Sequence, residues 1–168
     1  MPQGALRISV RKAGEDVNAM RLVRVQTEPF DIHAEQEALC RDNPRVGALV
    51  TFVGLMRDLN AGMGVVRMTL EHYPGMTEKA LGALVAEASE RWTLEGVRLV
   101  HRVGTLEPLD PIVFVGVASR HRGEAFRACE FLIDSLKTRA PFWKKEVTEA
   151  GERWVEARAT DEEAARRW

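Results

Sequence analysis

The sequence predicts an α+β domain with a mixed, mostly antiparallel sheet and its long helices packed on one face. Two segments, residues 77–92 and 123–139, carry apolar side chains at helical spacing. Short segments rich in β-branched and aromatic residues lie before, between and after them. The resulting order of strand pair, helix, strand pair, helix and strand packs most simply as two layers around one hydrophobic core.

The first part of the chain is expected to hold an extension, a strand and a short helix. Residues 1–20 are polar and have no periodic pattern, so we expect a mobile N-terminal extension ahead of a single domain formed by residues 21–168. Residues 22–26 favour a strand. Asp31 is placed to cap a helix over residues 33–41.

Two further segments have the pattern of strands. Residues 46–53 are rich in β-branched side chains, and residues 66–72 alternate apolar with polar ones. We expect them to pair as a hairpin whose tip, residues 57–64, is long and flexible. Thr77 is then expected to cap the first long helix.

The second half of the chain is expected to supply the centre of the sheet. Residues 97–106 favour a strand, and residues 112–118 are almost entirely apolar, which indicates a central strand. After the second long helix, residues 142–146 are interpreted as a turn. A last strand over residues 153–157 and a short C-terminal helix complete the prediction.

Composition limits the classes of function. The chain has 168 residues, and its 45% hydrophobic and 29% charged content is that of an ordinary soluble domain. Its net charge of −1 lacks the basic excess of a protein that grips nucleic acid, so any anion site must be local and suited to a small ligand. No apolar run approaches a membrane span, and we expect the bacterial cytoplasm. Cys40 and Cys129 form no Cys-x-x-Cys pair, so no zinc or redox motif is expected.

The strongest candidate for an anion site lies where a predicted central strand meets the second long helix. His121 and Arg122 stand at that junction, where unpaired backbone N–H groups carry partial positive charge. Together they make a natural phosphate site. The alternative is that both are solvated loop residues.

Lysines near the end of the same helix are candidates for chemistry. Lys137 stands beside Leu136, and Lys144 follows the aromatic pair Phe142-Trp143. A lysine against apolar neighbours can act as an acid, a base or a nucleophile. The alternative for Lys137 is a charge that favours a helix C-terminus.

Two more cations are candidates for binding an anion. Lys145, beside Lys144, is counted among the substrate-binding candidates, although it can equally be a solvated lysine. Arg57 opens a glycine-containing loop that could fold over a phosphate. No nucleotide-binding loop, metalloprotease motif or serine-nucleophile elbow is present. The residues alone therefore indicate a small-anion site that uses no metal and no cofactor.

Four tracts carry a resemblance to a known family. They read TFVGLMRD (residues 51–58), LEHYPGMTEKAL (70–81), IVFVGVASRHRGEAF (112–126) and LKTRAPFWKKE (136–146). Together they resemble the catalytic large subunit of molybdopterin synthase, called MoaE in bacteria, over residues 22–168. The string LKTRAPFWK is long, unusual and correctly placed after the His-Arg pair.

The resemblance implies a fold, an activity and an assembly. The expected fold is of the α/β hammerhead type, and the expected unit is a homodimer within a heterotetramer. A small ubiquitin-like sulfur-carrier subunit would dock at each end and insert a Gly-Gly tail that ends in a thiocarboxylate. The expected substrate is cyclic pyranopterin monophosphate, which receives two sulfurs to give molybdopterin in molybdenum-cofactor synthesis.

The resemblance also assigns roles to residues. The family's two catalytic lysines match Lys137 and Lys144, its substrate-binding His-Arg pair matches His121 and Arg122, and its loop arginine matches Arg57. A cationic pocket agrees with this chemistry, because two anions must approach each other there.

Three points stay open at this level. The chain could instead be a non-catalytic module that docks a ubiquitin-like protein, although loss of a lysine would have favoured that interpretation. A weak RNA-binding domain is disfavoured by the near-neutral charge and the lack of an aromatic platform. Arg158 is a candidate to reach the neighbouring pocket across a dimer.

Overall fold

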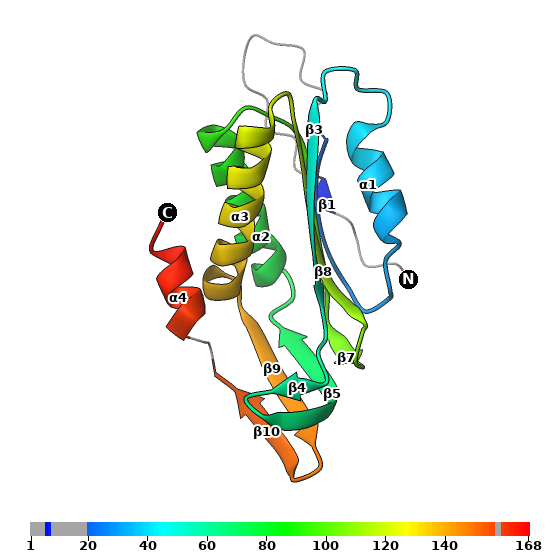
Figure 1. Ribbon diagram of the computed structural model, residues 1–168, viewed down its shortest axis with the longest axis vertical. Helices are drawn as coiled ribbons and strands as arrows, with labels where there is room; N and C mark the ends of the chain where they lie inside the picture. The colour runs from blue at the N-terminus through cyan, green and yellow to red at the C-terminus, as the bar shows by residue number, and fades with distance from the viewer. Residues whose placement is uncertain (1–5, 8–19, 157–158) are drawn as a thin grey trace.

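The computed structural model describes residues 6–7, 20–156 and 159–168. The predicted extension lies almost entirely outside these residues, and so does Arg158. The described chain contains two five-stranded sheets and four helices (Figure 1). The helices are α1 (Ile32–Cys40), α2 (Met76–Arg91), α3 (Arg122–Arg139) and α4 (Ala159–Ala165).

The first sheet forms the body of the molecule. Its strands in spatial order are β1 (Leu6–Arg7), β2 (Met20–Gln26), β6 (Leu94–Arg102), β8 (Pro111–Ser119) and β3 (Ala48–Leu55). Only the pair β2–β6 is parallel among the described strand pairs, so the predicted mixed, mostly antiparallel sheet is confirmed.

The second sheet lies below the first in Figure 1. It runs β10 (Gly151–Val155), β9 (Phe142–Thr148), β5 (Met63–His72) and β4 (Leu59–Asn60), and β7 (Gly104–Leu106) also pairs with β5.

The main core lies between the first sheet and the two long helices, which share one face as predicted (Figure 1). Leu81, Leu84, Phe131 and Leu132 point from the helices into it and are fully buried. The shorter α1 packs on the opposite face of the sheet, over Phe114. The first sheet is therefore covered on both sides, which explains why β8 is almost entirely apolar.

Helix ends follow local chemistry, with one exception. The Asp31 carboxylate accepts hydrogen bonds from the backbone N–H groups of His33 and Ala34, so the predicted cap of α1 is confirmed. The predicted cap at Thr77 is wrong, because α2 begins at Met76 and its N-cap is Gly75. The Glu78 carboxylate accepts from the Gly75 N–H at 2.6 Å instead.

The predicted hairpin is wrong. The segment of residues 46–53 belongs to β3 and pairs with β8 in the first sheet, whereas residues 66–72 belong to β5 in the second sheet. β5 folds back on the short β4 through Ala61 and Gly62, both at positive φ (52° and 77°). Composition identified the first strand and alternation the second, but neither identified the strand partners.

Two other predictions along the chain also needed correction. The single strand expected over residues 97–106 is divided at Gly104, whose φ of +83° turns the chain from β6 in the first sheet to β7 in the second. The turn expected over residues 142–146 is instead the start of β9, which pairs with β5 and β10.

The described part of the chain contains no helix long and apolar enough to cross a membrane. The two cysteines are free. Burial raises the pKa of the Cys129 thiol to about 12, so this residue acts as a small apolar side chain in the core.

Candidate active site

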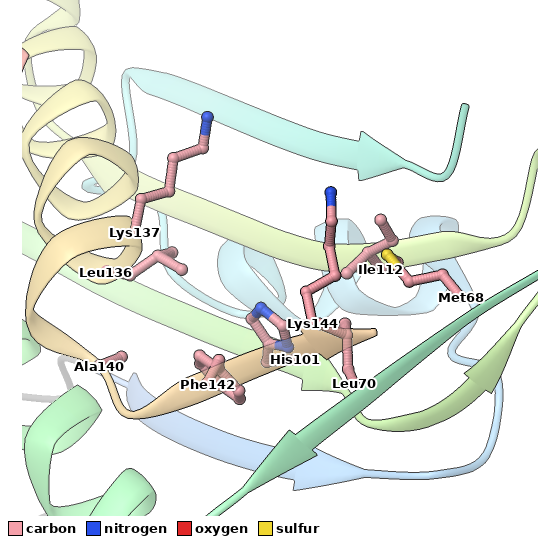
Figure 2. A pocket seen from close by; sticks show the side chains of 9 residues that line it. All are labelled: Met68, Leu70, His101, Ile112, Leu136, Lys137, Ala140, Phe142 and Lys144. Carbon is pink, nitrogen blue, oxygen red and sulfur yellow. The ribbon is translucent and has the colours of Figure 1, made fainter. Parts of the chain in front are cut away.

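A pocket of about 180 Å³ lies where the last turn of α3 passes into β9. Figure 2 shows both lysine side chains rising to the same side of this pocket, with an imidazole on the floor between them. The lining residues are Met68, Leu70, His101, Ile112, Leu136, Lys137, Ala140, Phe142 and Lys144. The structure therefore brings together the two lysines that the sequence predicts to be catalytic.

Lys137 is held by the end of a helix. It lies in the last turn of α3, which ends at Arg139 just ahead of Pro141. Its side chain is 48% exposed, and its ammonium group lies 3.3 Å from the Asp161 carboxylate of α4. Lys137 is therefore half open to solvent, with one anionic neighbour from the C-terminal helix.

Lys144 is held by a strand and a carboxylate. In β9 it pairs with Leu70 of β5 on one side and Val155 of β10 on the other. Its ammonium group lies 3.2 Å from the Glu146 carboxylate, which is on the same face of the strand two residues later. This ion pair fixes the direction of Lys144 toward the pocket.

Glu146 is the anchor of a buried polar cluster. Its carboxylate accepts hydrogen bonds from Asn60 at 2.7 Å and from Arg153 at 2.9 Å, in addition to the Lys144 contact. Burial by itself would raise the pKa of the Glu146 carboxyl, but the three donors outweigh burial and hold the pKa below its ordinary value. The carboxylate stays charged and keeps Lys144 in place.

His101 forms the floor of the pocket. It lies in β6, its ring stacks on Phe142 with centroids 4.0 Å apart, and it is 5% exposed. Its pKa is lowered to about 4, mainly by burial; the hydrogen bond to the Arg102 carbonyl opposes this shift, and the nearby His72 adds a smaller lowering effect. His101 is therefore neutral near pH 7.

Lys145 is not part of this pocket. Neighbouring residues of a strand point to opposite faces, so Lys145 lies on the other side of β9 from Lys144. There it pairs with Glu152 at 3.2 Å and lies over the Trp154 ring at 5.8 Å. An anion in the pocket would meet Lys144 and not Lys145 of the same chain.

Arg57 lies at the edge of the pocket region. It follows Met56, which is buried in the same cluster as Met68, Leu70 and Ile112 of the pocket wall. Arg57 itself is exposed, at the point where β3 leaves the first sheet.

His121 and Arg122 lie at the far end of α3. Fifteen residues separate Arg122 from Lys137, and a rise of 1.5 Å per residue places their backbones about 22 Å apart. His121 is the N-cap of the helix, and both residues are exposed. One copy of the chain therefore does not bring the predicted phosphate pair to its own lysines.

The end of the strand that precedes this pair is held in place by a buried carboxylate. Glu95 at the start of β6 contacts Arg45 at 2.9 Å and Arg120 at 2.8 Å. Burial alone would raise the pKa of Glu95, but the two arginines and Asn43 together lower it. The loop that carries His121 is thus tied to the sheet.

Sequence reasoning missed His101, Phe142 and Glu146. His101 lies inside a predicted strand, and nothing in a strand pattern says that it faces a pocket. The turn predicted over residues 142–146 hides Phe142 and Glu146, although the sequence there alternates with a period of two, in which Phe142, Lys144 and Glu146 share one face. That period was the available signal.

The pocket has the chemistry of a small-anion site. It offers two ammonium donors and one neutral ring in a wall that is otherwise apolar. Among the described residues there is no group of three or more His, Cys, Asp or Glu side chains that could hold a metal ion. The arrangement can hold an anion and exchange protons with it.

Comparisons with known proteins identify the family of this chain. The sequence model of the family described as "MoaE protein" matches residues 25–139. A molybdopterin synthase catalytic subunit from Pseudomonas aeruginosa is 58% identical over 87% of this chain and 97% of its own length. One from Ralstonia nicotianae is 57% identical over 89% of this chain and 85% of its own length.

A solved structure gives the same result. The molybdopterin biosynthesis MoaE protein from Burkholderia ambifaria superposes with a TM-score of 0.75 at 57% identity, over 89% of this chain and 97% of that chain. With these matches over most of its length, the chain belongs to the MoaE family.

Proposed function

We propose that this chain is the catalytic subunit of a molybdopterin synthase. It would transfer sulfur from the C-terminal thiocarboxylate of a small ubiquitin-like carrier to cyclic pyranopterin monophosphate, in the cytoplasm. The observation that carries the proposal is the convergence of Lys137 and Lys144 on one pocket from two different elements. Relatives that are 57% and 58% identical have the name of this activity, which supports the same conclusion.

The pocket suits the proposed reaction in its charge. The carrier tail and the pterin phosphate are both anions, and their approach is opposed by mutual repulsion. Two ammonium groups in a largely apolar wall offset that repulsion more effectively than they would in water. Lys144 is oriented by Glu146, whereas Lys137 is half exposed and is the better placed of the two to exchange a proton or attack.

The phosphate-binding residues would come from a second copy of the chain. β3 is the last strand of the first sheet, and among the described residues no strand pairs with its outer edge. That strand also exposes Leu49, Phe52 and Leu55, an apolar edge that favours association. We therefore place the contact of a homodimer along β3.

The direction of β3 makes this arrangement productive. Its first residue, Ala48, pairs with Ser119 beside His121, and its last residue, Leu55, pairs with Pro111 beside the pocket. A two-fold axis would run two β3 strands antiparallel. The His121–Arg122 end of one copy would then face the Lys137–Lys144 pocket of the other.

Light scattering tests the homodimer. The isolated chain at micromolar concentration should have twice its mass of 18.9 kDa. Adding the carrier should give a heterotetramer with one carrier on each copy. A monomer mass would contradict both the dimer and a phosphate site shared across it.

Reconstitution tests the activity. The chain is mixed with a thiocarboxylated carrier and cyclic pyranopterin monophosphate, and the dithiolene product is measured. Product formation is the expected result. The second candidate, a docking module without chemistry, predicts that the carrier binds and no product forms.

A further inference from the structure

The pocket contains one hydrogen-bond acceptor whose role the two lysines do not explain. Of its lining side chains, both lysines can only donate, and the others except His101 are apolar or, for Met68, a weak acceptor. His101 is buried and lies on the pocket floor between the lysines (Figure 2).

The hydrogen bond of His101 fixes which nitrogen is the acceptor. Its Nδ1 lies 2.8 Å from the carbonyl oxygen of Arg102. A carbonyl oxygen only accepts, so Nδ1 must carry the hydrogen and Nε2 must hold a lone pair. Within the described part of the chain, Nε2 has no hydrogen-bond partner from the protein.

The ring is also held in orientation and in charge state. Stacking on Phe142 at an interplanar angle of 18° prevents the imidazole from turning away. Burial holds the pKa of His101 near 4, so no proton occupies Nε2 at neutral pH. Nε2 is not among the enclosed atoms that lack a partner, so on a residue that lines the pocket it is open to the pocket space, and a ligand that displaces solvent there must supply a donor.

We propose that His101 is a specificity-determining residue, which accepts through Nε2 a hydrogen bond from an N–H group of the molecule that enters the pocket. The inference rests on the proposed function for the identity of that molecule. A ligand with an anionic end and a nearby N–H matches two cationic donors beside one neutral acceptor. Both proposed reactants have this chemistry: the terminal glycine amide of the carrier tail and the ring N–H groups of the pterin.

Two substitutions distinguish the effect of the Nε2 acceptor from the effect of the aromatic ring. His101→Phe keeps an aromatic ring on Phe142 but removes the lone pair, and we expect kcat/KM to fall about 10-fold or more. His101→Gln places an amide oxygen close to the position of Nε2 and should recover most of that loss. His33→Phe, at an exposed histidine of α1 that does not line the pocket, is the control.

The two sources of the N–H are distinguished by varying one reactant at a time. If the carrier tail is the donor, His101→Phe raises KM for the carrier. If the pterin is the donor, the same variant raises KM for the pterin. A value within twofold of wild type for both would overturn the proposal.

A binding measurement separates this inference from the proposed activity. Histidine ¹⁵N NMR on the wild-type chain reports the Nε2 resonance of His101 without any reaction. Adding carrier with an ordinary carboxylate tail, or adding the cyclic pterin, should shift that resonance as a new N–H···N bond forms. No shift with either ligand would contradict the proposed hydrogen bond to His101, even if the wild-type chain makes dithiolene. Absence of dithiolene with an intact shift would instead count against the proposed reaction.

Discussion

The two sheets of this molecule differ in how their strands are buried and covered. In the first sheet β6 and β8 are buried along nearly their whole length, and helices cover both faces. The second sheet has a small apolar cluster of its own and keeps charged groups in its interior, with Glu146 bonded to Lys144 and Arg153. The first sheet also buries charged groups, such as Arg98 with Glu35, and supplies His101 to the pocket. The difference is that helices cover both faces of the first sheet, whereas the second sheet carries Lys144 at the pocket.

The candidate site lies at the junction of these two regions. α3 packs on the first sheet and passes directly into β9 of the second, so the two lysines are seven residues apart but come from different elements. Substitutions on the two sides of the junction should therefore separate stability from activity.

The largest expected effect is on activity. Lys137→Ala should lower product formation about 100- to 10,000-fold, as for removal of an acid–base group, while the chain stays folded. The measurement is the single-turnover rate alongside circular dichroism. Lys79→Ala, at an exposed lysine of α2, is the matched control. Activity of Lys137→Ala within threefold of wild type would remove Lys137 from the mechanism.

The opposite result is expected in the first sheet. Phe114 of β8 is fully buried and packs edge-to-face on Phe30. Phe114→Ala should cost about 3–5 kcal/mol of the free energy of unfolding, because truncation leaves a cavity. Urea denaturation measures the loss. The fraction that remains folded should keep a normal turnover rate, and a stable but inactive variant would contradict the division between the sheets.

Mild acid should lower the stability of the folded chain through His101. An unfolded histidine takes up a proton near pH 6.5, whereas His101 has a pKa of about 4 in the folded state. The folded state then binds fewer protons than the unfolded state. The contribution of neutral His101 to the free energy of unfolding is therefore fully present above pH 6.5 and is lost as the pH falls toward 4. The loss is about 3 kcal/mol.

Denaturation at several pH values between 7 and 4 measures this effect. The carboxylates of Glu95 and Glu146, whose pKa values are lowered, lose their contribution only below their ordinary value of 4.5. His101→Phe should therefore flatten the profile between pH 6.5 and 4.5 and leave the steeper fall below it. An unchanged profile in that variant would show that another group is responsible.

A smaller effect is expected at the far end of α3. Arg122→Ala should weaken pterin binding by about 1.5–3 kcal/mol, the contribution of one charge-assisted contact to phosphate. KM for the cyclic pterin should rise, and carrier docking should be unchanged. Unchanged KM with loss of carrier docking would assign Arg122 to the protein interface instead.

The smallest effect is expected on the outer face of the second sheet. Lys145 points away from the pocket and pairs with the exposed Glu152, and such surface pairs contribute little. Lys145→Ala should leave the turnover rate within about threefold of wild type. A change of that size corresponds to the loss of no more than one weak hydrogen bond. A loss as large as that of Lys137→Ala would mean that both faces of β9 meet substrate.

Local patterns predicted much of the fold. The spacing of apolar residues placed α2 and α3, and the short polar side chain of Asp31 placed the start of α1. These features depend on residues within a few positions of each other. The partners of β3 and β5 could not be predicted in the same way, because strand pairing joins residues far apart in the chain.

The site shows the same division. Lys137 and Lys144 were found from their neighbours in one string, and the structure brings both to the pocket. Lys144 and Lys145 point to opposite faces because β9 is a strand. Pro141 and the charged residues after it suggest a turn there, so the strand was not predicted. His101 lines the pocket near the end of β6, just before Gly104 turns the chain toward the second sheet, and no pattern around His101 predicts that position.

The order of strands in the first sheet has a consequence for synthesis on the ribosome. The two central strands, β6 and β8, are made after their outer neighbours β2 and β3, and Met20 of β2 finds its parallel partner only at Gly96. β2 lacks its β6 partner until residue 102 has emerged, and β3 lacks its β8 partner until residue 119 has emerged. Such late, non-local closure slows folding and leaves nascent chains prone to aggregation. Expression at low temperature or with extra chaperone should therefore increase the soluble yield of this chain.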